Sequence, residues 1–301
     1  MLTVKEKNID WALALSGGGA RGLAHIGFLK GLEDSGFPKP SLIAGTSMGA
    51  IIGGLYACGI SPPEMIRFIQ TEFKISDYLD SFAFRLGGKV GRIFQTGQML
   101  ASLAGRPGVD PGQRVLKLLE SLTGGKYFDE TRIPFRCNAV DLFSGREVVF
   151  SSGSIARAMR ASMSVPGFFE PLMDENMCLV DGGIYGNLPA AIARQEGYKR
   201  ILAVNVNHFS QQSSGDIKNG PEVFFRCLEC AVNVLEKEKR SGEELTIDVI
   251  DDADPFSFFR HRELIALGER RVTECKTELE SFFKHHLNIL EKLPEFRRNN
   301  D

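Results

Sequence analysis

The residues Gly45-Thr46-Ser47-Met48-Gly49 have the G-x-S-x-G pattern of a serine nucleophile held on a sharp turn between a strand and a helix. A short apolar strand pattern, Leu42–Ala44, precedes them, and a small-residue helix pattern over 50–55 follows them. Flanking glycines suit such a turn, because it is strained and side chains there would collide with neighbouring backbone. The pattern and its context predict an acyl hydrolase with Ser47 as the nucleophile.

A second candidate site is the glycine loop Gly17–Gly22, which follows the apolar strand pattern Trp11–Ser16 and opens a helix pattern. Its G-x-G-x-x-G spacing also occurs in dinucleotide-binding folds, which need an acidic residue about twenty positions further on, at the end of the second strand. Here that strand ends at the turn of Ser47, and Glu33 and Asp34 come too early, within the helix. We therefore favour an anion-binding loop without a nucleotide.

The same loop suits the oxyanion of an acyl-transfer reaction. Glycines let backbone amides point at developing charge, and the start of a helix adds a favourable dipole. We expect the amides of Gly17, Gly18 and Gly19 to form an oxyanion hole with the amide of Met48, the residue after the nucleophile. Arg21 has two interpretations: it holds a phosphate or the loop itself, or it forms a structural ion pair.

These motifs alone leave the base that activates Ser47 open. In the usual α/β-hydrolase order of Ser, Asp and His, His208 could follow Asp181 as the third member. His25 lies in the helix after the glycine loop, where we expect a packed or capping residue. The other histidines are typical of a charged surface: His261, His285 and His286. In isolation, Asp181-Gly182-Gly183 is most simply a tight turn after a strand.

Four sequence blocks together are far more specific than any one of them. They are Gly17–Gly22, Gly45–Gly49, Ala161-Ser162-Met163-Ser164-Val165-Pro166 and Asp181-Gly182-Gly183, in this order, between about Trp11 and Val206. In this arrangement the chain resembles the patatin-like phospholipase family, of the bacterial type. Asn187 and Pro189, after the last block, fit the same pattern.

The resemblance implies a Ser–Asp dyad, with Ser47 as nucleophile, Asp181 as proton acceptor and no catalytic histidine. An exposed aspartate has a pKa of about 3.9 and is a poor base at neutral pH. Burial beside the apolar strand Cys178–Val180 would raise that pKa toward a useful value. The third block implies a wall near the site, to which we assign no chemistry. The other motif residues have supporting roles: Arg21, Gly22, Gly45, Gly49, Gly182 and Gly183.

The activity that this resemblance implies is that of a serine lipid acyl hydrolase, of the phospholipase A or lysophospholipase kind, with an acyl-serine intermediate. The expected substrate is a phospholipid or another lipid ester. We expect no cofactor and no metal, since the sequence has no carboxylate-rich calcium loop and no histidine cluster with ligand spacing. Two alternatives stay open: a catalytically idle binding or regulatory protein that keeps the fold, and an acyltransferase that uses the same acyl-serine.

Composition and charge limit the partners and the location that we expect for the protein. A net charge of −2 over 301 residues implies no general attraction to nucleic acid. Residues 1–8 have mixed charge and no apolar signal-peptide core, which favours the cytoplasm, with transient contact at a membrane surface as a further expectation. The uncharged segment 40–63 is long enough to span a membrane. Its glycines, Thr46, Ser47 and Pro62-Pro63 make it too weakly apolar, so we expect it to be buried in protein.

Strand patterns alternate with helix patterns along the chain, which predicts an α/β fold with a mostly parallel sheet. With the resemblance, the prediction is a three-layer α/β/α patatin-like hydrolase fold. We expect one domain over 5–255, with its motif-bearing core over 11–207, and a helical extension of that domain over 256–301. The glycine-broken stretch 76–111 is either a flap near the site or a plain surface excursion.

Two further segments carry weaker signals. Cys227 and Cys230 form a lone C-x-x-C in an apolar helix pattern over 223–235, and without a second pair we expect core cysteines rather than a zinc or redox site. The stretch 282–298 mixes aromatic, aliphatic and basic residues at helical spacing. It would either pack its apolar face on the domain, which we favour, or lie on an anionic membrane surface.

Overall fold

The structure is a computed structural model, in which residues 9–74, 77–80, 107–209, 220–239, 242, 244–251, 255 and 257–290 are described. The strands are β1 (Ala12–Leu15), β2 (Leu42–Gly45), β3 (Gly108–Asp110), β4 (Phe135–Asp141), β5 (Arg146–Phe150), β6 (Gly167–Phe169), β7 (Leu172–Asp174), β8 (Met177–Asp181), β9 (Ile201–Asn205) and β10 (Leu245–Asp248). The α-helices are α1 (Ala24–Asp34), α2 (Met48–Ala57), α3 (Pro62–Thr71), α7 (Gln113–Thr123), α8 (Ile155–Ser162), α9 (Ala190–Gln195), α10 (Gly220–Lys239), α11 (His261–Glu274) and α12 (Lys276–Leu290).

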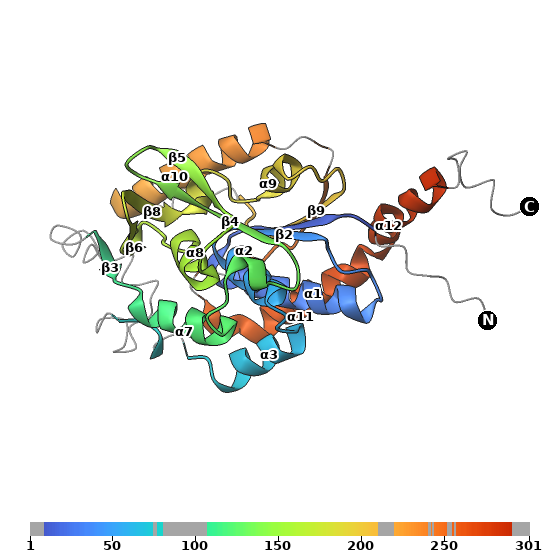
Figure 1. Ribbon diagram of the computed structural model, residues 1–301, viewed down its shortest axis with the longest axis horizontal. Coiled ribbons are helices and arrows are strands. Elements are labelled where there is room, and N and C mark those ends of the chain that lie inside the picture. Colours follow the sequence, from blue (N-terminus) through green and yellow to red (C-terminus); the bar gives the residue numbers. More distant parts are fainter. Residues whose placement is uncertain are drawn as a thin grey trace, which may run out of the picture.

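The main sheet is mixed, with a parallel majority. The strands β10, β9, β1, β2 and β4 are neighbours in that order and parallel, and β8, β7 and β5 add antiparallel pairs beside β4. Helices cover both faces: α9 and α10 lie on one, and α1, α2, α8 and α11 lie on the other (Figure 1). The predicted three-layer α/β architecture is therefore confirmed. The short strands β3 and β6 pair separately and have no counterpart in the sequence prediction.

The two faces of the sheet differ in side-chain size. Successive residues of a strand point to opposite faces, so Leu13 and Leu15 of β1 join the large core around α1 and α2, whereas Ala12 and Ala14 join a smaller cluster with residues of α9. Both cores are closed to solvent around β1, whose four residues are fully buried. Strands buried on both faces are typical of parallel sheets under helices.

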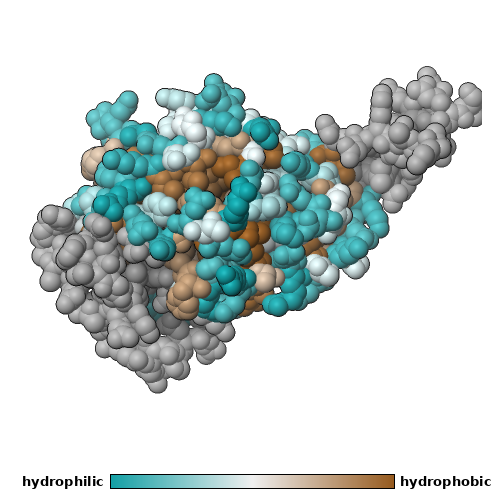
Figure 2. All heavy atoms as spheres, turned by 90° about the horizontal axis from the view of Figure 1, so that it is seen from below, coloured by the Kyte–Doolittle hydropathy of each residue, from teal (hydrophilic) through white to brown (hydrophobic). Residues whose placement is uncertain are grey.

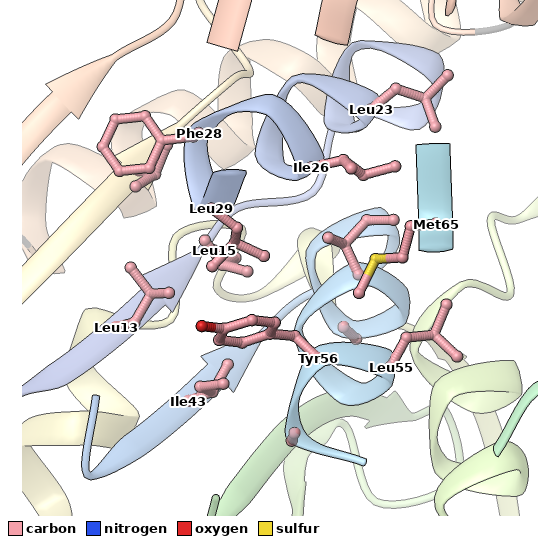
Figure 3. Close-up of a cluster of buried hydrophobic side chains, with 14 of the residues drawn as sticks. Leu13, Leu15, Leu23, Ile26, Phe28, Leu29, Ile43, Leu55, Tyr56 and Met65 are labelled. Carbon is pink, nitrogen blue, oxygen red and sulfur yellow. The ribbon is translucent and has the colours of Figure 1, made fainter. Parts of the chain in front are cut away.

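The helix α2 also has two faces, one of small and one of large residues. A Cβ atom at Gly49 would lie 2.2 Å from the carbonyl oxygen of Leu15, and one at Gly53 would lie 2.8 Å from Cγ2 of Ile43, so these glycines let the helix lie directly on the sheet. Of the large residues, Leu55 points away from the sheet: Figure 3 shows Leu55 and Tyr56 on opposite sides of α2, with Tyr56 toward the strands. The uncharged segment around the nucleophile is thus a buried strand, turn and helix, as predicted.

The C-terminal helices share the core of the N-terminal strands. A Cβ atom at Gly27 of α1 would lie 1.8 Å from the carbonyl oxygen of Ile265 in α11, so the two helices cross at very close range. Leu264 and Val272 are buried in the same cluster as β1. The division into 5–255 and 256–301 stays a prediction. Among the described helices, none is both long and apolar enough to span a membrane.

The start of the C-terminal stretch packs on the domain. The rings of Phe282 and Phe283 meet Trp11 edge to face, at centroid distances of 6.0 and 5.2 Å. The predicted helical extension contains two helices, α11 and α12, which are separated at the buried Cys275. Phe283 of α12 is buried in the core. Residues 291–298 lie outside the described residues.

The prediction of core cysteines in α10 is wrong. Cys227 and Cys230 are exposed. The helix is held partly by its charged side: the Glu236 carboxylate accepts hydrogen bonds from the backbone amides of Asn187 and Leu188. An apolar helical pattern does not tell which side of a surface helix faces the protein. Most of the glycine-broken stretch 76–111, which the sequence predicts to be a flap or a surface excursion, lies outside the described residues, and its end contributes β3.

Candidate active site

Ser47 occupies the turn between β2 and α2, in the conformation that the motif predicts. Its φ is 53° and its ψ is −120°, a region that L-residues rarely adopt and that persists only where the surrounding structure enforces it. Its backbone amide donates a hydrogen bond of 2.9 Å to Oγ of Ser162. The residue is 8% exposed, so its hydroxyl group stands at the edge of a cavity rather than on an open surface.

Asp181 ends β8 and meets Ser47 side chain to side chain through a hydrogen bond. Its Oδ1 also accepts the amide of Gly183 at 2.7 Å, within the short turn Gly182–Ile184. Burial raises the pKa of this carboxyl group to about 6, and the hydrogen bonds from Ser47 and Gly183 oppose that rise. A carboxylate of this pKa is ionised at neutral pH and is a far better base than an exposed aspartate.

The third sequence block holds both members of this pair. Ser162 accepts the amide of Ser47, and the carbonyl oxygen of Ser164 accepts the amide of Asp181 at 2.9 Å. The Ser164 hydroxyl is in turn bonded to the buried Arg160, whose guanidinium also donates to the carbonyl oxygens of Gly112 and Glu170, among others. The block is therefore a connector between Ser47 and Asp181, a role that sequence reasoning missed.

A second connector is Asn138, a fully buried residue of β4. The hydroxyl of Thr46 donates to Oδ1 of Asn138 at 2.8 Å, and Nδ2 of Asn138 donates to the carbonyl oxygen of Gly186 at 3.1 Å. The turn before Ser47 is thus bonded to the loop after Asp181. No motif marks Asn138, because its partners are brought together only by the order of the strands.

The glycine loop lies beside Ser47. A Cβ atom at Gly17 would lie 2.5 Å from Oδ1 of Asn187 and 3.0 Å from Cβ of Ser47, so only glycine fits there. The amide of Gly17 donates to the carbonyl oxygen of Asn187 at 3.1 Å, which corrects the prediction that it serves the oxyanion hole. Gly18 and Gly19 line the cavity at Ser47, and their amides stay predicted donors together with that of Met48.

The remaining predicted motif residues lie around the site and support its backbone. Arg21 donates to the carbonyl oxygen of Gly18 and, at 2.7 Å, to Oδ1 of Asn207, so it braces the loop at the edge of the cavity. Gly45 ends β2, Gly49 lies in the first turn of α2, and Gly22 lies where a Cβ atom would meet Met48.

Neither candidate histidine replaces Asp181 as the hydrogen-bond partner of the Ser47 side chain. His25 is fully buried and bonds through Nε2 to the carbonyl oxygen of Ser16 at 2.9 Å, as expected of a packed residue. Burial lowers its pKa to about 4, so it is neutral at physiological pH. His208 is exposed at the rim of a cavity.

Two cavities of opposite character meet at Ser47. One, of about 280 Å³, is enclosed by aliphatic and aromatic side chains of α2, α3 and α7 and has Glu64 as its single charged lining residue among the described residues. The other, of about 750 Å³, also contains Asp181 and is lined mainly by polar and charged side chains between the glycine loop and α10. In the described part of the chain, no cluster of three or more His, Cys, Asp or Glu side chains has the arrangement of a metal site.

Residues 13–194 match the family model described as patatin-like phospholipase. The chain belongs to the patatin-like phospholipase family. It is 32% identical over 213 residues to lysophospholipase NTE1 of Mycosarcoma maydis, which covers 69% of this chain and 10% of that protein. It is 34% identical over 197 residues to patatin-like phospholipase domain-containing protein 6 of Homo sapiens, covering 65% of this chain and 13% of that protein.

A bacterial relative is nearer in length. An uncharacterised NTE family protein of Mycobacterium bovis is 32% identical over 196 residues, covering 65% of this chain and 49% of that protein. The chain thus spans from about a tenth to about half the length of these relatives. Among solved structures, VipD from Legionella pneumophila is similar over 88% of this chain and 66% of that one, at 15% identity and a TM-score of 0.48.

Proposed function

We propose that this patatin-like protein is a serine lipid acyl hydrolase, of the phospholipase A or lysophospholipase kind. The observation that carries the proposal is the hydrogen bond between Ser47 and a buried Asp181, whose pKa is raised to about 6. A surface turn would leave that carboxylate hydrated and weakly basic. The family membership and the lysophospholipase names of two relatives support a lipid ester as the substrate.

The mechanism runs in two half-reactions. In the first, Oγ of Ser47 attacks the ester carbonyl carbon while Asp181 accepts its proton. The amides of Gly18, Gly19 and Met48 stabilise the tetrahedral oxyanion, a contribution of about 3 kcal/mol for each donor in comparable sites. The carbon–oxygen bond to the alcohol then breaks, the alcohol leaves with the proton held by Asp181, and the acyl group stays on Ser47.

In the second half-reaction, Asp181 accepts a proton from a water molecule while the oxygen of that water bonds to the acyl carbon. The bond to Oγ of Ser47 breaks, Oγ recovers the proton, and a fatty acid leaves. The dyad is thereby restored with no histidine and no net change in protonation. Because one carboxylate serves both halves, its ionised fraction controls both rates.

The two cavities support an amphipathic substrate. The apolar one has the lining that a fatty-acyl chain requires, and the polar one offers asparagine side chains and charges of both signs to an alcohol with a hydrophilic head group. Arg21, a cationic residue within the glycine loop, lines the polar cavity. We therefore assign the acyl chain to the apolar side of Ser47 and the leaving alcohol to the polar side.

The test combines a covalent probe with lipid turnover. A fluorophosphonate probe should label the wild type at Ser47, and incubation with lysophosphatidylcholine should release fatty acid. Ser47→Ala should lose both, while Ser151→Ala, a change at an exposed serine near α8, should keep both. Labelling that survives in Ser47→Ala contradicts the nucleophile assignment. Transfer of the acyl group to added glycerol in preference to water identifies an acyltransferase, and no turnover of any ester identifies an idle binding protein.

A further inference from the structure

The helix that starts at the nucleophile also forms one wall of the apolar cavity. Four large residues of α2 line it: Met48, Ile51, Ile52 and Leu55. Their spacing of three, one and three places them on one face of a helix. The opposite face carries the small residues that pack on the sheet, so α2 presents a continuous apolar strip leading away from Ser47.

The rest of the cavity encloses this strip. Figure 3 shows Leu55 on the same side of α2 as Met65 of α3 and Ile26 of α1. The α7 side chains Leu118 and Leu119 line the cavity too. Figure 2, which views the molecule from the side of α3 and α7, shows apolar side chains gathered near the middle of this face among hydrophilic ones. An occupant attached to Ser47 therefore has apolar contacts along α2.

We propose that α2 is a length gauge for the acyl chain, in which Ile51 and Leu55 meet successive segments of the chain that is esterified to Ser47. The inference rests on the proposed function, since the occupant is the acyl group of that intermediate. The cavity itself supports this occupant: it includes Ser47, its lining is almost uncharged, and a polar leaving group has a separate cavity on the other side.

Helix geometry gives the distance of each α2 residue from Ser47, and therefore the acyl-chain length at which it meets the chain. At a rise of about 1.5 Å per residue, Ile51 lies about 6 Å and Leu55 about 12 Å along the axis from Ser47. An extended hydrocarbon chain advances by about 1.3 Å per carbon, from a carbon–carbon bond of about 1.5 Å. Ile51 is thus beside about the fifth carbon of the acyl chain, and Leu55 beside about the ninth. A bulkier residue at either position blocks the chain at a different length.

The experiment measures kcat/KM on p-nitrophenyl esters with acyl chains from two to sixteen carbons. For the wild type, kcat/KM should rise by up to about fourfold per added methylene while the chain is being buried. In Ile51→Trp the rise should stop near five carbons, and in Leu55→Trp near nine. Both variants should hydrolyse the two-carbon ester within about threefold of the wild type, which also shows that they are folded.

Two further variants complete the design. Leu55→Ala removes contact without blocking the cavity, so it should lower only the rates on chains beyond about eight carbons, by about fivefold to tenfold. Val234→Trp, at a 55% exposed position of α10 outside both cavities, should leave the length profile unchanged. If the tryptophan variants do not fold, the alanine variant still tests the gauge.

The outcomes separate the two proposals. Ordered cut-offs, with Ile51→Trp stopping at a shorter chain than Leu55→Trp, support the gauge. Equal losses at every length, or unchanged profiles in folded variants, overturn the gauge and leave the hydrolase in place. If neither the wild type nor Val234→Trp turns over any ester, and the fluorophosphonate probe labels no serine, the hydrolase proposal fails and the gauge fails with it.

Discussion

Two aspartates on neighbouring strands, at opposite ends of their pairing, differ in the direction in which the fold shifts their pKa values. Asp141 ends β4 and Asp181 ends the antiparallel β8, and each residue is 5% exposed. The pKa of Asp141 is lowered to about 2, while that of Asp181 is raised to about 6. Exposure of the residue therefore does not decide which way the pKa moves.

The difference lies in the balance between burial and hydrogen-bond donors: burial of the carboxyl group is the largest cause of the shift at Asp181, whereas hydrogen bonds outweigh it at Asp141. Asp141 caps the β4–β5 hairpin: the Ser144 hydroxyl lowers its pKa most, and the amides of Cys178, Phe143 and Ser144 add to the effect. Asp181 receives one amide, from Gly183, and the hydroxyl of Ser47, too few to offset its burial. A carboxylate with many donors is a good cap and a poor base, and one left short of donors keeps its affinity for a proton.

The largest expected difference between the two is in activity. Asp181→Asn removes the proton acceptor and should lower kcat by about 10³-fold or more on every ester, whatever the chain or head group. Asp141→Asn, the matched control on the adjacent strand, should keep kcat within about threefold of the wild type. The measurement is steady-state hydrolysis of p-nitrophenyl butyrate by both variants. Comparable losses in the two would mean that Asp181 acts only through the fold.

The pH dependence should follow Asp181 alone. Its base form is needed, and its pKa in the folded protein is about 6, so log kcat/KM should rise by about one per pH unit below pH 6 and level off above it. Between pH 4.5 and 6 this amounts to roughly a twentyfold increase. Asp141 is ionised throughout this range, so Asp141→Asn should show the same profile. A plateau that extends down to pH 4.5 would contradict the raised pKa.

The sequence predicts these two roles unequally. The Gly45–Gly49 and Asp181–Gly183 blocks predict the proposed dyad because each carries its own local turn chemistry. The connectors are harder to predict: the Ser162 hydroxyl contacts the Ser47 amide across 115 residues of chain, and Asn138 joins two loops from the middle of a strand. Such contacts depend on strand order and on side-chain direction, which the periodicity of one segment does not contain.

Helices and strands likewise differ in how well the sequence predicts them. Long segments with strong periodicity, such as α1 and β4, were predictable from the sequence, whereas the three-residue strands β3, β6 and β7 were not. The exposed Cys227 and Cys230 show that an apolar pattern gives the kind of element but not the side that is buried. No glycine or proline marks the break between α11 and α12 at Cys275, a residue that is buried in the core together with Leu279 and Phe283.

A smaller effect should come from the connector beside the dyad. Ser162→Ala removes the acceptor of the Ser47 amide, which helps hold the unusual backbone of the nucleophile. We expect kcat to fall by about tenfold, the size of one lost buried hydrogen bond, with KM and the apparent pKa near 6 unchanged. Ser162→Thr keeps the hydroxyl and should recover part of the rate. A shift of the pH profile in Ser162→Ala would instead indicate that Ser162 acts on Asp181.

The last contrast is in stability, because the two carboxylates should contribute to the free energy of unfolding with opposite signs. The pKa of Asp181 rises from 3.8 in the unfolded chain to about 6 on folding, so the folded protein is penalised wherever the group is ionised, above about pH 6, and not below about pH 4. The shift corresponds to a destabilisation of the folded protein by roughly 3 kcal/mol. Asparagine removes this penalty but adds a smaller one, because its buried amide is also desolvated. Asp181→Asn should therefore raise the free energy of unfolding by about 1–2 kcal/mol at pH 8 and by less as the pH falls to 5.

Asp141 is the mirror case in this measurement. Its pKa is lowered on folding, so its contribution is present above the unfolded pKa and is lost only as the pH falls toward about 2. Asp141→Asn should accordingly lower the urea midpoint at both pH 5 and pH 8, whereas Asp181→Asn raises it at pH 8. If both variants were destabilised at pH 8, the Asp181 carboxylate would be fully compensated by its partners. A carboxylate whose burial is fully compensated would have a pKa that is not raised, and it would be a poor base for the Ser47 hydroxyl.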